Sequence, residues 1–114
     1  MHLLKALPIK AITKINKLSK YIIDSFENIN FIYKITLNTQ LMLKNNNIFQ
    51  SDLYKYTAKI FDEGIKESIV IADDPLKLAQ IYWSNMYVYA LTIIFTKDYK
   101  KLTEEDLNRM VVRK

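Results

Sequence analysis

Residues 78–95, LAQIYWSNMYVYALTIIF, contain no charged residue, and they decide the fold of this 114-residue chain. Before them stands Asp73-Asp74-Pro75, in which either aspartate can cap a helix and the proline suits its first turn. These signals predict a helix over 75–96. Eighteen uncharged residues reach the lower length limit of a membrane span, but polar side chains such as Asn85 and three tyrosines are unfavourable in a lone span. We therefore expect protein to cover this helix, and no membrane association.

Apolar side chains occupy both faces of the predicted helix, so both faces need a cover. The rest of a chain this small can cover one face, and the other face predicts a second subunit, most simply in a two-fold dimer. The residues of the long helix expected at the dimer interface are Leu76, Ala79, Trp83, Met86, Tyr87, Ala90 and Ile94. A last helix, beginning at Thr103, carries an apolar stripe of its own, formed by Leu107, Met110 and Val111.

Helical spacing of apolar residues extends over the remaining chain. It predicts helices over 8–28, over 31–45 with Asn30 as cap, and over 52–70 with Ser51 as cap. One Gly and two Pro are too few for the many tight turns of a β-sandwich or barrel. The sequence therefore predicts a single all-α domain spanning 1–114, an antiparallel bundle of about five to six helices.

Two predicted helices leave questions open. In the nearly uncharged helix over 31–45, the polar side chains need partners, either neighbouring backbone and water or a bound small molecule. In the helix over 52–70, Gly64 either permits close approach of a neighbouring element or is simply tolerated. The inward face of that helix is expected to carry Leu53, Tyr56, Ile60, Phe61 and Ile65.

The composition excludes several kinds of chemistry. Without cysteine the chain has no disulfide, no thiolate nucleophile and no cysteine-ligated metal site. Its one histidine, His2, cannot supply a pair of metal ligands, and its one glycine cannot form a phosphate-cradling loop. Acidic pairs such as Asp62-Glu63 lie at predicted helix ends or turns, where capping explains them. We expect no catalytic residue, no metal and no cofactor.

The net charge of +5 is concentrated at the N-terminal end, where residues 1–20 carry five lysines and no acid. Four of them fall on the polar half of the helix over 8–28. Such a face is either solvated or directed at a membrane or nucleic acid. Lysines without interleaved aromatic or arginine side chains specify little, which favours the solvated face. The N-terminus has no secretory signal, so we expect a cytoplasmic protein.

The second half of the chain carries a familiar succession of motifs: 60-IFDEGI-65, the acidic turn 73-DDP-75, 78-LAQIYW-83 and 102-LTEEDL-107. In this order, over about 51–114, they resemble the C-terminal regulatory domain of TetR-family transcriptional repressors. The resemblance implies that the last two helices pair with their mates in a four-helix dimer interface. It also implies DNA binding only through a helix-turn-helix domain, which 1–114 lack. Residues 1–7 are then expected to be the remnant of a linker helix.

Two functions follow as expectations. The resemblance implies an effector-binding and dimerisation domain, in which a small hydrophobic or amphipathic molecule binds between the helices and is coupled to DNA release in a full-length repressor. The alternative is a stand-alone helical dimerisation or protein-interaction module without a small-molecule ligand. The residues expected to line the effector site are Phe31, Ile35, Asn38, Thr39, Met42, Tyr56, Phe61, Tyr82, Asn85 and Tyr89.

Overall fold

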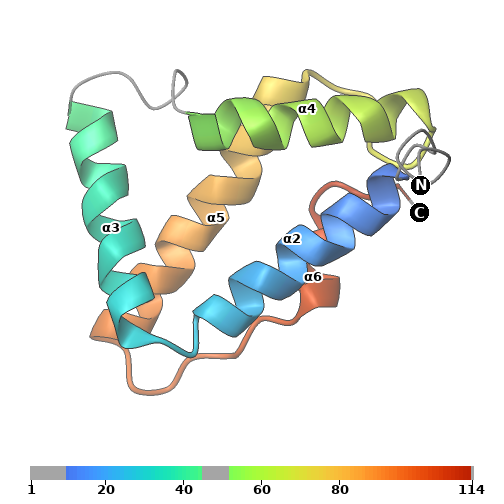
Figure 1. Ribbon diagram of the computed structural model, residues 1–114. Helices are drawn as coiled ribbons and strands as arrows, with labels where there is room; N and C mark the ends of the chain where they lie inside the picture. The colour runs from blue at the N-terminus through green and yellow to red at the C-terminus, as the bar shows by residue number, and fades with distance from the viewer. Residues whose placement is uncertain (1–9, 45–51, 114) are drawn as a thin grey trace, which may run out of the picture.

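The prediction of an all-helical chain is confirmed by a computed structural model, which describes residues 10–44, apart from the side chain of Met42, and 52–113. Within these residues the only β feature is an isolated bridge between Val70 and Val112. None of the described helices is long and apolar enough to cross a membrane. The helices are α2 (Ala11–Ser25), α3 (Ile29–Lys44), α4 (Asp52–Lys66), α5 (Pro75–Phe95) and α6 (Glu104–Arg109) (Figure 1).

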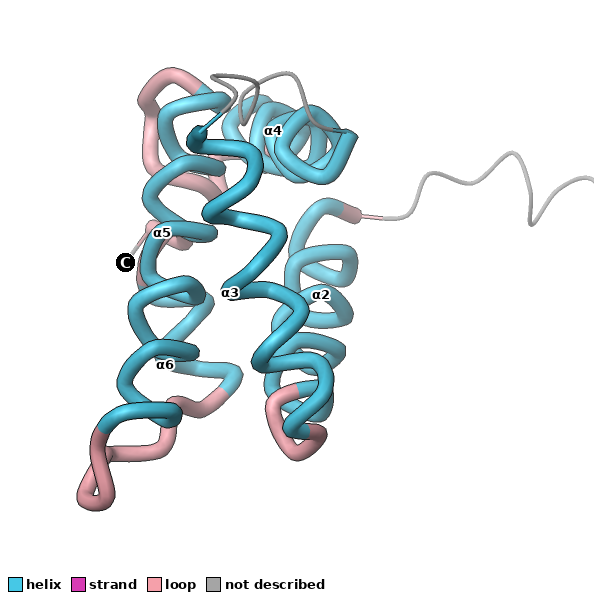
Figure 2. The backbone as a smooth tube through the Cα atoms, turned by 90° about the vertical axis from the view of Figure 1, so that its left-hand side faces the viewer, coloured by secondary structure: helices cyan, strands magenta, loops and turns pink. Residues whose placement is uncertain are grey.

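The helices enclose the core from several sides. α4 crosses the top of the molecule and packs on both α5 and α2 (Figure 1). α3 contacts α5, and in the view turned by 90° it lies nearest the viewer, between α5 and α2 (Figure 2). The short α6 packs against α2. Sequence segments far apart, α2 and α6, therefore lie side by side across the core.

Side-chain caps fix three helix starts. Asp74 Oδ1 accepts a hydrogen bond from the backbone N–H of Leu76 at 3.0 Å, as the sequence predicts for α5. Thr103 and Asp106 form a reciprocal capping box at the start of α6. At α3 the prediction is wrong by two residues, because Asn28, not Asn30, accepts the N–H bond. The expected cap Ser51 and residues 1–7 lie outside the described part of the chain.

α4 ends at Lys66, four residues before the predicted end. The backbone N–H of Ile69 donates to the carbonyl of Gly64 at 2.8 Å, and that of Ser68 donates to the carbonyl of Ile65 at 3.0 Å. Ser68 has a φ of 61°, so these bonds close the helix as a left-handed C-terminal cap. The cap turns the chain back towards the core and places Val70 against the helix that it has just left.

Gly64 permits this return. A Cβ added at Gly64 would lie 3.1 Å from the Cβ of Val70 and closer still to its Cγ2. Val70 is buried, and its backbone is held by the bridge to Val112. Of the two interpretations of the glycine, close approach of a neighbouring element is therefore the one the structure supports.

The inward face of α4 differs from the predicted one. Leu53 and Tyr56 are exposed, whereas Tyr54 and Thr57 are buried beside Ile60 and Phe61. Because Thr57 is polar, the spacing of apolar residues cannot show that it faces the core. Its hydroxyl donates to the carbonyl of Leu53 at 2.7 Å and accepts a hydrogen bond from the indole N–H of Trp83 at 3.0 Å.

The buried face of α5 is the face that we expected a second subunit to cover. α4 and the rest of the chain cover it, so these side chains belong to the core of the single chain. Leu76, Tyr87, Ile94 and Met110 are partly exposed. The expected interface residues that are buried within the chain are Ala79, Trp83, Met86, Ala90, Leu107 and Val111.

A chain of polar side chains, which runs from the core to the surface, ties α2, α5 and α6 together. Ser19, which is fully buried, donates to Asn108 Oδ1 at 2.6 Å, and its oxygen lies 3.1 Å from the hydroxyl of Tyr82. A serine hydroxyl has one hydrogen, and Ser19 donates it to Asn108, so in the contact with Tyr82 the tyrosine hydroxyl is the donor. Asn108 in turn donates to Asn16 Oδ1 at 2.7 Å. Every member has a partner, which is the condition for such a chain to stabilise a core.

Alkaline pH should weaken the fold through Tyr82. Burial raises the pKa of its hydroxyl from 10.0 to about 12. Between these values the unfolded chain releases a proton that the folded chain retains, so the free energy of unfolding falls as pH rises. We expect Tyr82→Phe to be less stable at neutral pH but to lose less stability between about pH 9 and pH 11.5 in urea unfolding. Tyr56→Phe, at an exposed ring, should keep the wild-type slope, and equal slopes in all three proteins would contradict this account.

Candidate functional site

A groove of about 240 Å³ opens between α2, α3, α4 and α5. We call it the α3–α4 groove. Most of its lining is aromatic or aliphatic, with a small number of polar groups, as is common for sites that bind small molecules between helices. Its lining residues are Tyr21, Phe31, Lys34, Ile35, Asn38, Thr39, Leu53, Tyr54 and Trp83.

Two nearly buried aromatic side chains contribute to the lining. Trp83 of α5 and Tyr54 of α4 are 6% and 3% exposed. The indole N–H of Trp83 donates to the hydroxyl of Thr57, and this hydrogen bond fixes the orientation of the indole ring. Burial raises the pKa of the Tyr54 hydroxyl. At the α2 side, the rings of Tyr21 and Phe31 meet edge to face with centroids 6.5 Å apart. These aromatic rings give the groove rigid apolar surface.

Three polar side chains of α3 line the same groove. Lys34 is the one charged residue of the lining, and Asn38 and Thr39 follow it four and five positions later. No side chain within 10–44 and 52–113 hydrogen-bonds to any of the three. Their donors and acceptors are therefore available to a ligand whose apolar part contacts Trp83 and Ile35.

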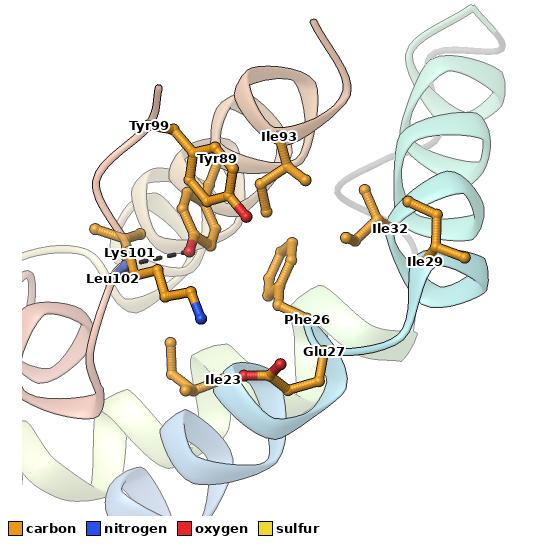
Figure 3. A pocket seen from close by; sticks show the side chains of 10 residues that line it. All are labelled: Ile23, Phe26, Glu27, Ile29, Ile32, Tyr89, Ile93, Tyr99, Lys101 and Leu102. Atoms are coloured by element: carbon orange, nitrogen blue, oxygen red, sulfur yellow. Dashed lines mark hydrogen bonds between the residues drawn. The ribbon is translucent and has the colours of Figure 1, made fainter. Parts of the chain in front are cut away.

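A second cavity of about 320 Å³ lies at the opposite end of α5 (Figure 3). Phe26 and Tyr89 meet edge to face inside it, with ring centroids 4.9 Å apart, and Tyr89 also contacts Tyr99. The hydroxyl of Tyr89 accepts a hydrogen bond from the backbone N–H of Leu102 at 3.2 Å. This contact fixes the segment between α5 and α6. The hydroxyl of Tyr89 is therefore already used in holding the fold together, while the other polar groups of the lining are those of Glu27 and Lys101.

The structure brings together four of the ten residues expected at the effector site, all on α3: Phe31, Ile35, Asn38 and Thr39. Tyr89 lines the second cavity instead. The side chain of Met42 lies outside the described part of the chain.

The other four expected residues are dispersed. Phe61 and Tyr82 pack on each other in the core, with ring centroids 5.5 Å apart. Tyr56 is 60% exposed on α4. Asn85 is exposed on α5, and its side-chain amide donates to the carbonyl of Ile81 and approaches the sulfur of Met110. None of these four lines the groove.

Two carboxylates with lowered pKa values have structural roles. The backbone N–H of Asp74 holds the pKa of Asp73 below its usual value, and Thr103 has the same effect on Asp106. Both shifts arise from turn and capping contacts far from the groove. Across 10–44 and 52–113, no three His, Cys, Asp or Glu side chains lie close enough to hold a metal ion.

The lysines of α2 are partly used within the chain. Lys14 forms an ion pair with Glu63 of α4 at 2.8 Å, and Lys20 pairs with Asp24 at 3.3 Å. The first of these pairs joins two helices that pack together. A role in holding and solvating the fold accounts for this part of the basic face.

No family model, curated protein or solved structure matches this chain. The function must therefore be argued from the groove and the surface of the molecule themselves.

Sequence reasoning missed the groove residues that come from other helices. Tyr21, Leu53 and Tyr54 carry no signal of their own, since nothing in a sequence shows which helix crosses which. Lys34 was available as a signal, because it is the one charge between Phe31 and Leu43 in a helix of apolar and neutral polar residues. Trp83 was expected at the dimer interface instead.

Proposed function

We propose that this chain is a regulatory module that binds a small amphipathic molecule in the α3–α4 groove and associates with a second copy of itself. The observation that carries the proposal is the groove's lining, in which Trp83 and Ile35 offer apolar surface beside three polar side chains without partners in the described chain. The resemblance of about 51–114 to TetR-family regulatory domains supports the same role, and DNA binding would then belong to another domain.

The lining favours an anionic head group. Lys34 supplies the only charge in the groove, and Asn38 and Thr39 can each donate a hydrogen bond. An aliphatic or aromatic body can bury against Trp83 and Tyr54 while its carboxylate stays near Lys34 at the exposed edge. A medium-chain fatty acid such as decanoate has this chemistry.

Isothermal titration calorimetry tests the site with decanoate and decylammonium, which share the same alkyl body. We expect decanoate to bind and decylammonium to bind more weakly, because its head group is repelled by Lys34. Lys34→Gln should weaken decanoate by about fivefold at low salt, as for an exposed charge pair. Asn38→Phe, which fills the mouth of the groove from an exposed position, should weaken decanoate by about tenfold or more, equivalent to 1.4 kcal/mol.

Lys44→Gln is the matched control for charge, since Lys44 lies on the same helix and does not line the groove. It should bind decanoate as the wild type does. Decanoate binding that is equal in all four proteins, or absent from the wild type, would count against the groove as the effector site.

A second function, a stand-alone self-association module, has an observation of its own in its favour. Large apolar side chains remain exposed on α3 and α5, including Leu37 and Val88. In this case the groove would bind no molecule, and association would be the whole task of the chain. The calorimetry above distinguishes the two functions.

A further inference from the structure

Large apolar side chains are exposed on α3 and α5, two helices that pack against each other, and we call their exposed sides together the α3–α5 face. We propose that this face binds the same face of a second copy, so that two helices from each copy form a four-helix interface. The inference rests on the self-association in the proposed function and deepens it by assigning the surface, which differs from the one expected from the sequence.

On α3 the exposed residues follow one line along the helix. Ile29, Tyr33, Leu37 and Leu41 recur at every fourth position, and each is about half exposed or more. Residues four apart lie on the same side of a helix. Ile32 lies on another side of α3 and is buried. α3 is therefore apolar on two sides, and the described part of the chain covers only one of them.

On α5 the exposed residues follow a second line. Ile81, Val88 and Phe95 recur at every seventh position, with Ser84 and Leu91 between them. A seven-residue spacing is that of helices that pack along their length. Phe95 is 81% exposed, the most of any large apolar residue in the described chain. Exposure on this scale is unusual unless something binds there.

A hydrogen bond joins the two lines. The side-chain amide of Gln40 donates to the hydroxyl of Tyr87 at 3.4 Å. Gln40 is three residues beyond Leu37, which is exposed, and Tyr87 is four residues before Leu91, which is partly exposed, so each lies one helix turn from an apolar residue of its own line. The contact therefore lies at the seam between α3 and α5 and makes their exposed sides neighbours.

Charge favours a second copy as the occupant. The chain carries a net charge of +5, yet α5 has no charged residue from Leu78 to Phe95, and on α3 Lys34 lines the groove while Lys44 ends the helix. Two copies can meet over the centre of this face without placing like charges opposite each other. A strongly acidic partner would find no basic groups there to pair with.

The area of the face is sufficient for a dimer. α3 and α5 have 16 and 21 residues, which at 1.5 Å per residue gives lengths of about 24 and 31 Å. With a helix width of about 10 Å each, the face measures on the order of 500 Å² per copy, or about 1,000 Å² in total. That is close to the minimum of about 1,000 Å² that a biological interface needs.

Sedimentation equilibrium of the full chain across a dilution series tests the assignment. We expect a particle of twice the 13.5 kDa chain mass at low micromolar concentration. Leu37→Glu and Val88→Glu introduce a charge at positions that are each 57% exposed, where the monomer can accept it. Each should raise the dimer dissociation constant about 100-fold, because the dimer would bury that charge twice. Tyr56→Glu, at a 60% exposed residue of α4 outside the face, is the matched control and should stay dimeric.

The outcomes separate this inference from the groove. A wild type that is monomeric at all concentrations overturns the α3–α5 interface and leaves the face to a different partner protein. A dimer that resists both face variants also overturns the assignment, because another surface must then hold it. Decanoate binding by monomeric Val88→Glu would show that the groove functions without the interface, whereas an intact dimer that binds no decanoate would refute only the effector site.

Discussion

Tyr82→Ala is expected to lower the free energy of unfolding by about 3–5 kcal/mol, the usual cost of removing a buried aromatic ring. Tyr82 is the largest fully buried side chain of the described core, and its ring meets those of Phe61 and Trp83 at 5.5 and 5.6 Å. The substitution also removes the hydroxyl that donates to Ser19. A domain of this size is stable by about 5–15 kcal/mol, so the variant should be close to unfolding.

Urea denaturation followed by circular dichroism measures this loss. Tyr56→Ala makes the same chemical change at an exposed ring and should cost less than about 0.5 kcal/mol. If both substitutions cost the same, the core arrangement around α5 described here is incorrect.

Gly64→Ala is expected to destabilise the chain by about 1–3 kcal/mol, the usual cost of forcing an extra methyl group into a packed core. Taken alone, alanine in a helix is better than glycine by about 0.8–1 kcal/mol, so a simply tolerated glycine would give a stabilised variant. The sign of the effect therefore tests whether Val70 packs directly against Gly64.

A double-mutant cycle identifies Val70 as the cause. Val70→Ala removes the Cγ2 atom that the new methyl group would meet, and it costs stability by itself because Val70 is buried. We expect the double variant to be more stable than the sum of the two single effects predicts, by about 1 kcal/mol or more. Strict additivity in urea unfolding would mean that the two residues do not touch.

The fold class and most of the helices were predictable because their signals are local. The uncharged run 78–95 and the capping residues Asp74 and Thr103 lie within or beside the helices that they specify. The early end of α4 was not predictable in the same way. Ser68 has a positive φ, a conformation that glycine usually adopts at the end of a helix. The sequence therefore has no glycine there to mark the end of α4.

The orientation of α5 was beyond the reach of the sequence. Both faces of that helix are apolar, and helical periodicity cannot tell which face meets the rest of the chain. In the structure the core takes residues from both faces, Tyr82 from one and Trp83 and Met86 from the other, and Val88 is exposed. The deciding contacts involve α4, and Thr57, a polar residue, is one of the most important.

The candidate site was predictable on one helix only. Four groove residues of α3 could be chosen because neutral polar groups stand among apolar ones within a single helix. The rest of the site depends on how α2, α4 and α5 cross, which is fixed by contacts between distant parts of the chain.

A ¹H–¹⁵N correlation spectrum recorded during a titration with decanoate tests the central claim most directly. Trp83 is the only tryptophan, so its indole N–H gives a single side-chain signal that needs no assignment. That group is held by Thr57 next to the groove, and we predict that its signal moves progressively and saturates as decanoate binds. An indole signal that stays in place while decanoate is added to saturation would contradict the α3–α4 groove as the binding site.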